Sequence, residues 1–561
     1  HYRSGRGHAI RTLAIEGDAD FHFQAGETAE QVVTRVSKQW PCEWVICWLP
    51  ELFPPPREIE GCPVRTAAIV SDWNVYFPQL EYNLSRYDVV LTDKLGAQVL
   101  GLHGAHPQYL FPLYSQRSHV HRKLPVDKDI DVLFVGHLNH AVHAERARCL
   151  EKLAALSDRY RVVICEGYLD DAYARLLNRA KIVFNHSVRR EMNLRCFETL
   201  ACGSLLFLEE SNLEAPDYLR DREEVVYYRP ENLVDLVEHY LARPEEREHI
   251  AQQGRQVGRS IAGEHRLDAL FDWLADQPGG TRAFEELAEE ERTFAEILQY
   301  GSSLVRSQCV VAAETSANAL RCWPERPEFL AAAGCLLLEG FEPRLLAESE
   351  NAARQVLSWF HEAATRAADA IVLWMNLAFV CRRIPAVETE ERCLQEALQA
   401  GSTAYGGLLL GSPSDPHYVA WRRSLALGKP DPNVLRSAAA ARLAELFLAE
   451  GKIEEAREFA LKSVHYYPRA AVGYRVLAET QLRGRNPRGA VECLGAGLVH
   501  APFDAEYRTR FLEVLLQLNE HAAARTLAEE SFWIFNACPH LEKEAAYFSL
   551  RRLDRRVGYH A

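Results

Sequence analysis

Arginine and glutamate side chains gather in one short stretch between two apolar runs. The stretch extends from Lys181 to Leu208 and reads KIVFNHSVRREMNLRCFETLACGSLLFL. Arg189, Arg190 and Arg195 carry guanidinium groups, which suit the oxygens of a diphosphate. Glu198 can accept hydrogen bonds from a pair of hydroxyls on a sugar ring. These residue types together indicate binding of a diphosphate and a sugar.

The elements that position these side chains can be predicted from the same stretch. KIVFN and SLLFL have the β-branched and aromatic character of buried parallel strands, and residues 193–201 fit a short helix that Gly203 ends. Parallel α/β sheets bind ligands at the carboxyl ends of their strands, where a helix N-terminus attracts phosphate. The stretch therefore predicts a ligand-binding edge of such a sheet. The alternative is an ion pair between Arg195 and Glu198 on a helix surface, beside a structural turn.

The wider sequence around Glu198 resembles a known family. RCFETLACGSLLF, followed by EEVVYYRPENLVDLVEHYLARPEEREHIAQQGRQVG, is similar to the donor-binding half of GT-B glycosyltransferases, especially the CgeB-like branch near family 4. The resemblance implies that Glu198 holds the ribose or the donor sugar of a nucleotide-sugar. Many family 4 enzymes carry two glutamates separated by seven residues, whereas six residues separate Glu191 from Glu198. The role is therefore carried over to Glu198 and hardly to Glu191.

A second run, IDVLFVGHLNHAVHAERARCLEKLAAL, reads as a strand that ends at Gly136, a polar loop and a helix. A glycine lets a diphosphate approach the backbone, and the following loop offers free N–H groups. In the family it resembles, a strand ending in FVG and a helix with an early arginine like Arg146 open the nucleotide domain. We therefore expect Gly136 and His137 to face the arginines, although a tight strand exit would also place a glycine here.

Residues for proton transfer to or from an acceptor are harder to assign. Asp72 lies in SDWNVY at a strand exit and is a candidate general base or acceptor ligand, with Trp73 stacking on a sugar. The ordinary alternative makes Asp72 a helix N-cap and Trp73 a core residue. His186 is the best placed of several histidines that could act as the base; the others are His103, His106, His137 and His140. No DxD motif stands in a plausible loop, so we expect a metal-independent enzyme without a cofactor. The co-substrate expected is a nucleotide-sugar, most often UDP-linked.

The chain divides into an α/β part and an all-α part. Strands alternate with helices over residues 1–114 and again over 130–277, joined by the polar segment 115–129, which predicts two Rossmann-like domains that face a cleft in a GT-B arrangement. Residues 283–561 have helical spacing throughout. Leu448, Leu482 and Leu516 recur every 34 residues, which predicts a TPR-like α-solenoid that is clearest over 438–539.

Composition narrows the choice of partners. The chain has 561 residues and a net charge of −14, which argues against a nucleic-acid or anionic membrane surface. Its 14 cysteines form no CxxC pair and no run is apolar enough to span a membrane, so we expect a reducing, cytoplasmic location.

The leading hypothesis is a glycosyltransferase that moves a sugar from a nucleotide-diphosphate donor to a polypeptide recruited by the TPR-like domain. The alternatives are a polysaccharide or lipid-linked acceptor, or a degenerate scaffold protein without activity. Self-association through the helical array is a further option. No GxGxxG follows an early strand, so an oxidoreductase is disfavoured.

Overall fold

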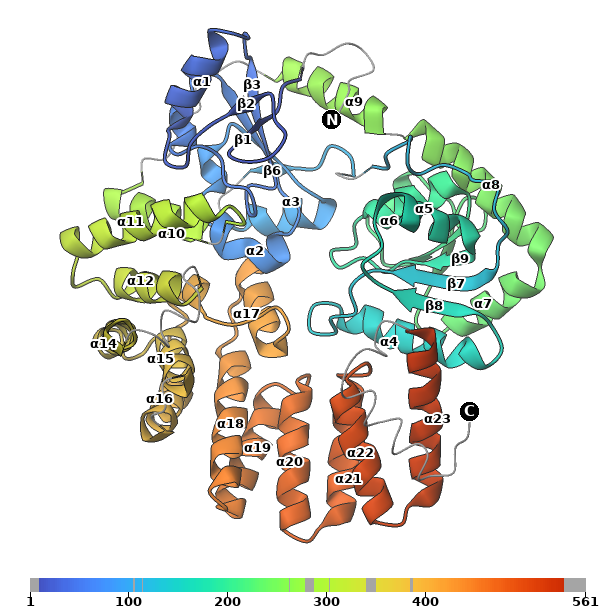
Figure 1. Ribbon diagram of the computed structural model, residues 1–561, viewed down its shortest axis with the longest axis vertical. Coiled ribbons are helices and arrows are strands. Elements are labelled where there is room, and N and C mark those ends of the chain that lie inside the picture. The colour runs from blue at the N-terminus through green and yellow to red at the C-terminus, as the bar shows by residue number, and fades with distance from the viewer. Residues whose placement is uncertain are drawn as a thin grey trace.

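Two parallel α/β domains and a helical solenoid make up the computed structural model (Figure 1). It describes residues 10–103, 106–112, 115–261, 263–277, 287–301, 303–339, 350–383 and 387–538. The Rossmann-like character and the helical array expected from the sequence are both confirmed.

The first domain contains a parallel sheet in the order β3-β4-β5-β6. The strands are β3 (Trp44–Trp48), β4 (Arg65–Ile69), β5 (Val89–Leu91) and β6 (Pro107–Gln108), beside a pair formed by β1 (Leu13–Ala14) and β2 (Phe21–His22). The helices are α1 (Ala29–Ser37), α2 (Trp73–Leu80) and α3 (Lys94–Gly101). Thr28 and Gln31 form a capping box that starts α1. The expected strands RTLAI and QYLFPLY are each reduced to two residues.

The second domain has a five-stranded parallel sheet in the order β11-β10-β9-β7-β8. Its strands are β7 (Ile130–Val135), β8 (Val162–Cys165), β9 (Ala180–Phe184), β10 (Leu205–Glu209) and β11 (Val226–Tyr228). Its helices are α4 (Ala144–Ala154), α5 (Asp170–Arg179), α6 (Leu194–Cys202), α7 (Leu233–Ala242) and α8 (Pro244–Ser260). Gly203 ends α6 with φ +72°, as predicted for a left-handed helix end.

Helix α9 (Gly263–Asp276) returns from the second domain to the first (Figure 1). Its Leu270 and Leu274 pack with Ala67 and Ile69 of β4 in one apolar cluster. The crossing helix expected over 265–277 is therefore present, and it ties the two sheets together by burying apolar surface.

The solenoid consists of helices packed as neighbours along the chain. They are α10 (Glu289–Gly301), α11 (Arg306–Cys322), α12 (Pro327–Glu339), α14 (Glu350–Arg366), α15 (Ile371–Arg383), α16 (Val387–Gln399), α17 (Pro416–Ala426), α18 (Pro432–Ala449), α19 (Ile453–Tyr466), α20 (Ala471–Arg483), α21 (Pro487–Leu498), α22 (Ala505–Gln517) and α23 (His521–Ala537). The repeating Ala456, Ala490 and Ala524 are fully buried where paired helices meet. The expected break at PGGTR lies outside the described residues. Within those residues, no helix is both long and apolar enough to cross a membrane.

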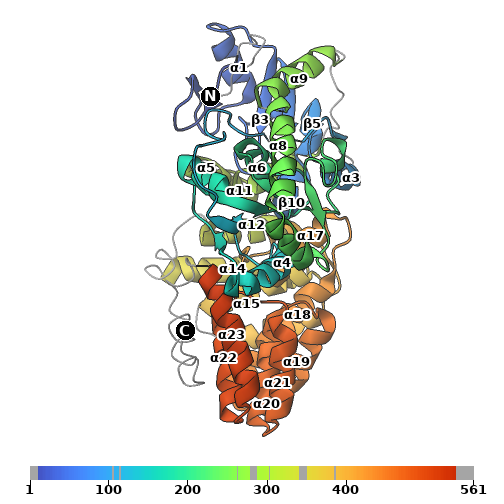
Figure 2. The same ribbon diagram turned by 90° about the vertical axis from the view of Figure 1, so that its right-hand side faces the viewer.

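Both ends of the solenoid are attached to the α/β part, so the chain closes on itself (Figures 1 and 2). At its start, Glu296 of α10 pairs with Arg57 of the first domain at 2.7 Å. At its end, Arg508 of α22 pairs with Glu151 of α4 at 2.8 Å, and Ser157 donates to the carbonyl of Trp533 in α23 at 2.9 Å. The solenoid thus bridges the two domains from the side opposite α9.

Candidate functional site

The carboxyl edges of the two sheets meet at Arg189, in the loop after β9. Its Nη1 lies 2.8 Å from Asp72 Oδ1 and its Nε lies 3.0 Å from Asp93 Oδ2, both in the first domain. Glu191 of its own loop lies 3.5 Å away. The guanidinium is 6% exposed. Three carboxylates neutralise Arg189, so it serves as a clamp between the domains and has little charge left for the diphosphate that the sequence assigned to it.

Asp72 stands at the N-cap position of α2, yet its side chain makes no capping bond. The carboxylate turns to Arg189 instead, and 41% of the side chain stays exposed. Trp73 is 2% exposed and donates its indole N–H to Asp93 at 2.9 Å. It is a core residue, so the predicted stacking of Trp73 on a sugar is wrong and its alternative holds.

Two other arginines gather over one aromatic ring at the end of β7. The Cζ atoms of Arg195 and Arg146 lie 4.5 Å and 5.2 Å from the ring centroid of Phe134. Arg195 donates to the carbonyl of Val135 at 2.9 Å and to Asn185 Oδ1. These acceptors are neutral oxygens, and the described residues bring no carboxylate within ion-pair distance of either arginine.

Arg146 is the more strained of the two electrostatically. Only 6% of it is exposed, its Nη2 donates to the carbonyl of His137 at 2.6 Å, and its Nε is buried without a partner. Burial first, and then the charge of Arg195, lowers the pKa of Arg146 to about 9. An uncompensated buried cation of this kind is costly, and a bound anion would relieve it.

The loop between β7 and α4 adds histidines to this electropositive edge. Burial first, and then Arg146 and Arg195, lowers the pKa of His143 to about 2. His186 is 8% exposed, with Nδ1 2.9 Å from the hydroxyl of Tyr228 and Nε2 3.7 Å from Glu145. His137 is exposed on the loop, with Nδ1 3.2 Å from Glu166.

Gly136 is required by a side chain of the site itself. A Cβ at this position would lie 2.4 Å from Arg195 Nη2 and 3.2 Å from the ring of Phe134. The glycine thus admits the guanidinium to the end of the strand, which is a reason for its presence that the sequence did not reveal.

Glu198 lies one turn after Arg195 on α6 and faces the linker. It is 8% exposed, its Oε1 lies 3.5 Å from His121 Nε2, and it is hydrogen-bonded to Tyr173 of α5. Burial raises the pKa of Glu198, opposed by Tyr173 and Arg195. The surface ion pair between Arg195 and Glu198 that the sequence left open is not formed; the sugar-binding role of Glu198 stays a prediction.

Arg190 lies apart from the buried clusters. It is exposed, its φ is +60°, and its carbonyl accepts the N–H of Leu213 at 2.8 Å. A second contact between the domains lies nearby, where Glu214 accepts the backbone N–H groups of Lys94 and Met192 at 3.1 and 2.8 Å. Burial raises the pKa of Glu214 to about 7.

Sequence reasoning missed Asp93, His143 and Glu214, and it used Arg146 only as a marker of the nucleotide domain. Asp93 offered a usable signal, because it follows β5 as Asp72 follows the adjacent β4, and neighbouring parallel strands end at one edge. Over the described residues, no group of three His, Cys, Asp or Glu side chains has a metal-binding arrangement.

Comparison with known proteins locates this site within a recognisable region. Residues 146–272 match the family model described as glycosyl transferase-like. The match starts at Arg146 and contains both Arg195 and Glu198, so the electropositive edge belongs to a glycosyltransferase-like domain. No curated protein matches the chain in sequence.

Three solved structures illustrate the similarity that extends to helical proteins. PilF of Pseudomonas aeruginosa is 13% identical over 47% of this chain and 96% of its own, with a TM-score of 0.32. TTC0263 of Thermus thermophilus, described as a TPR protein, is 16% identical over 40% of this chain and 99% of its own, with a TM-score of 0.24. MamA of Desulfovibrio magneticus is 11% identical over 38% and 98%, with a TM-score of 0.26. We assign the solenoid from the helix packing of this chain itself.

Proposed function

We propose that this protein is a GT-B-type glycosyltransferase that uses a nucleotide-diphosphate sugar as donor. The observation that carries the proposal is the pair Arg146 and Arg195, two guanidinium groups gathered over Phe134 without a counter-ion, inside the glycosyltransferase-like region. A diphosphate would supply the missing negative charge. Transfer breaks the bond between the anomeric carbon and the diphosphate oxygen, so negative charge grows on that oxygen. Fixed cations beside it lower the barrier, which is why we propose catalysis without a metal.

Asp72 is our preferred group for the acceptor hydroxyl. As a new bond forms between that oxygen and the anomeric carbon, the hydroxyl proton must leave, and a carboxylate can take it. Asp72 is fixed by Arg189 on one side and is 41% exposed on the other, so it is both oriented and accessible. His186 is the second candidate, but both of its ring nitrogens already face partners.

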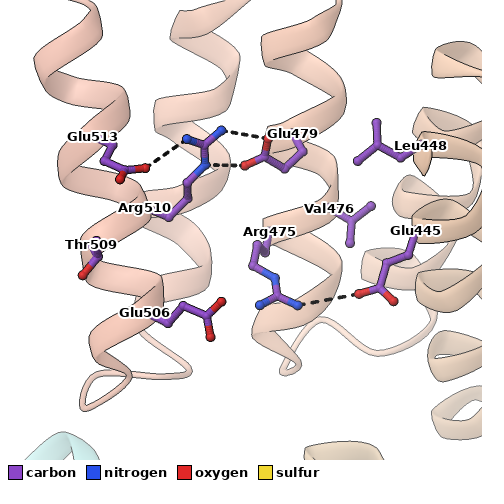
Figure 3. Close-up of a pocket in the computed structure, with 9 residues that line it drawn as sticks. All are labelled: Glu445, Leu448, Arg475, Val476, Glu479, Glu506, Thr509, Arg510 and Glu513. Atoms are coloured by element: carbon purple, nitrogen blue, oxygen red, sulfur yellow. Dashed lines mark hydrogen bonds and ion pairs between the residues drawn. The ribbon is translucent and has the colours of Figure 1, made fainter. Parts of the chain in front are cut away.

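We further propose that the acceptor is a polypeptide held by the solenoid. A pocket of about 500 Å³ opens between α18, α20 and α22 (Figure 3). Glu445, Glu479 and Glu513 line it at intervals of 34 residues. Arg510 pairs with Glu479 at 2.5 Å and with Glu513 at 3.1 Å, and Arg475 reaches Glu445 at 3.6 Å. The lining holds four glutamates and two arginines, a balance that favours an extended segment with basic side chains.

The test compares two arginines of one helix. Nucleoside diphosphates and nucleotide-sugars are screened by thermal shift and donor hydrolysis on the wild type, Arg146→Met and Arg148→Met, because Arg148 is exposed on the same α4. We expect a stabilising nucleotide and slow hydrolysis in the wild type and in Arg148→Met. Arg146→Met should lose the shift and about 100-fold in turnover. No response to any nucleotide would overturn the enzyme proposal and favour the scaffold.

A further inference from the structure

One helix of the solenoid is built into the first α/β domain. Helix α17 lies against α2 (Figure 1), and Leu425 and Ala426 of α17 pack in the core cluster of that domain. His103 lies 2.9 Å from the carbonyl oxygen of Ala426. Gly407, just before α17, contacts Pro78 so closely that a Cβ there would lie 2.9 Å from the proline. Side chains of α17 therefore belong to the same rigid unit as Asp72.

Arg422 of α17 is a buried cation with little to hold it. It is 6% exposed, and its Nε and Nη1 have no hydrogen-bond partner. Its remaining nitrogen makes one long bond of 3.4 Å to the carbonyl of Leu409, and its Cζ lies 4.9 Å from the ring centroid of Tyr418. The described residues give it no ion pair. Two unsatisfied donors on a buried guanidinium cost free energy that a ligand oxygen would recover.

The groups around Arg422 are those of the proposed acceptor side. Burial raises the pKa of Tyr76, with Asp72, Tyr418 and Glu51 adding to the rise and Arg422 opposing it. All of these groups therefore lie within electrostatic reach of the Tyr76 hydroxyl. Asp72 and Tyr76 lie four residues apart and share one side of α2.

Glu51 adds a second unsatisfied atom to this place. It is fully buried, its Oε1 accepts the N–H groups of Ser71 and Asp72 at 2.9 Å each, and its Oε2 has no partner. Burial raises the pKa of Glu51, so the protonated carboxyl is favoured and could itself donate a hydrogen bond. Orphaned polar atoms from the solenoid and from the first domain thus stand beside the same tyrosine.

We propose that Arg422, with Tyr418 and Tyr76, forms an oxyanion subsite that holds an acidic group of the acceptor beside Asp72. The subsite takes a carboxylate or a phosphate and places a neighbouring hydroxyl at the reacting carboxylate. It deepens the glycosyltransferase proposal and rests on it for the word acceptor. It also gives the solenoid a direct role in binding at the site, in addition to any recruitment by its distant pocket.

The experiment separates this subsite from the donor site. Phosphate and acetate are titrated against full-length protein in the Arg146→Met background, which lacks the donor-side cation, and binding is followed by thermal shift. We expect saturable stabilisation that survives in Arg146→Met with Arg423→Met, an exposed neighbour on α17, and weakens at least 10-fold with Arg422→Met. Arg422→Lys should restore part of it, because the charge returns without the planar donor geometry.

Each result has one meaning. Tighter binding of acetate assigns a carboxylate acceptor, and tighter binding of phosphate assigns a phosphorylated one. Equal responses in Arg422→Met and Arg423→Met, or no response to either anion, would overturn the subsite. Donor hydrolysis by wild type and Arg422→Met should be equal, so a failure of the donor site itself would appear as absent hydrolysis in both proteins. Arg422→Met should remain folded, because it removes an unpaired buried charge.

Discussion

Two arginine sites at the same sheet edge differ in what surrounds them. Arg189 is held by Asp72, Asp93 and Glu191, whereas Arg146 and Arg195 are held only by neutral oxygens and an aromatic ring. Burial is similar for Arg189 and Arg146, at 6% exposed each. The difference in pairing therefore separates a structural arginine from one available to a ligand. Sequence spacing alone had grouped Arg189 with Arg195.

The largest expected effect is the loss of the paired arginine. Arg189→Met leaves three carboxylates at the domain junction without their cation, so the free energy of unfolding should fall by about 3–5 kcal/mol. Denaturant unfolding measures this. Arg190→Met, next to it and exposed, should change the free energy by less than about 0.5 kcal/mol. Equal small losses in both variants would show that Arg189 is not a clamp.

A smaller effect concerns Glu214, a buried carboxylate at the same junction that is held by backbone N–H groups. Its pKa rises from 4.5 to about 7, so the folded protein keeps a proton that the unfolded chain releases between these values. Stability should fall as pH rises through this window, by roughly 3 kcal/mol at most, and stay low above it. Melting temperatures across this range should give a flatter profile for Glu214→Gln. Asp217→Asn, exposed beside it, should keep the wild-type slope.

The smallest effect sharpens the comparison by pairing an unpaired arginine. Asn185 is fully buried and its Oδ1 accepts from Arg195 Nη1, so Asn185→Asp supplies a carboxylate of the same shape. Affinity for a nucleoside diphosphate should drop about 10-fold, or 1.4 kcal/mol, while ligand-free stability is kept. Isothermal titration measures the affinity. Asn232→Asp at the start of α7 adds the same charge elsewhere; an equal drop there would refute a local effect.

Much of the fold could be predicted because its strands and helices carry local signals. KIVFN, SLLFL and the glycine at 203 gave β9, β10 and the end of α6, and the 34-residue period gave the last solenoid helices. The strand expected over QYLFPLY is only two residues long. The earlier helices of the solenoid lack a clear repeat, because their packing uses varied residues such as Trp374 and Trp421.

The site was predictable in part for the same reason. Gly136 and Arg195 follow β7 and α6 at one edge, and strand order brings such ends together. The partners of Arg189 were not predictable, because Asp72 and Asp93 lie 117 and 96 residues earlier in another domain. Arg422 was out of reach too, since only the docking of α17 on α2 places it near Asp72. Contacts set by domain docking leave no periodic trace in a sequence.

The attachment of α23 to the second domain has a consequence for how the protein is made. Residues of α22 and α23 share one apolar cluster with β8 and α4, and the bond between Ser157 and Trp533 spans 376 positions. A ribosome needs on the order of tens of seconds to add the intervening residues. Until then the flank of the second domain is uncovered, so the nascent chain depends on chaperones there. The last helices act as a seal, and any chain that stops before them displays its own incompleteness.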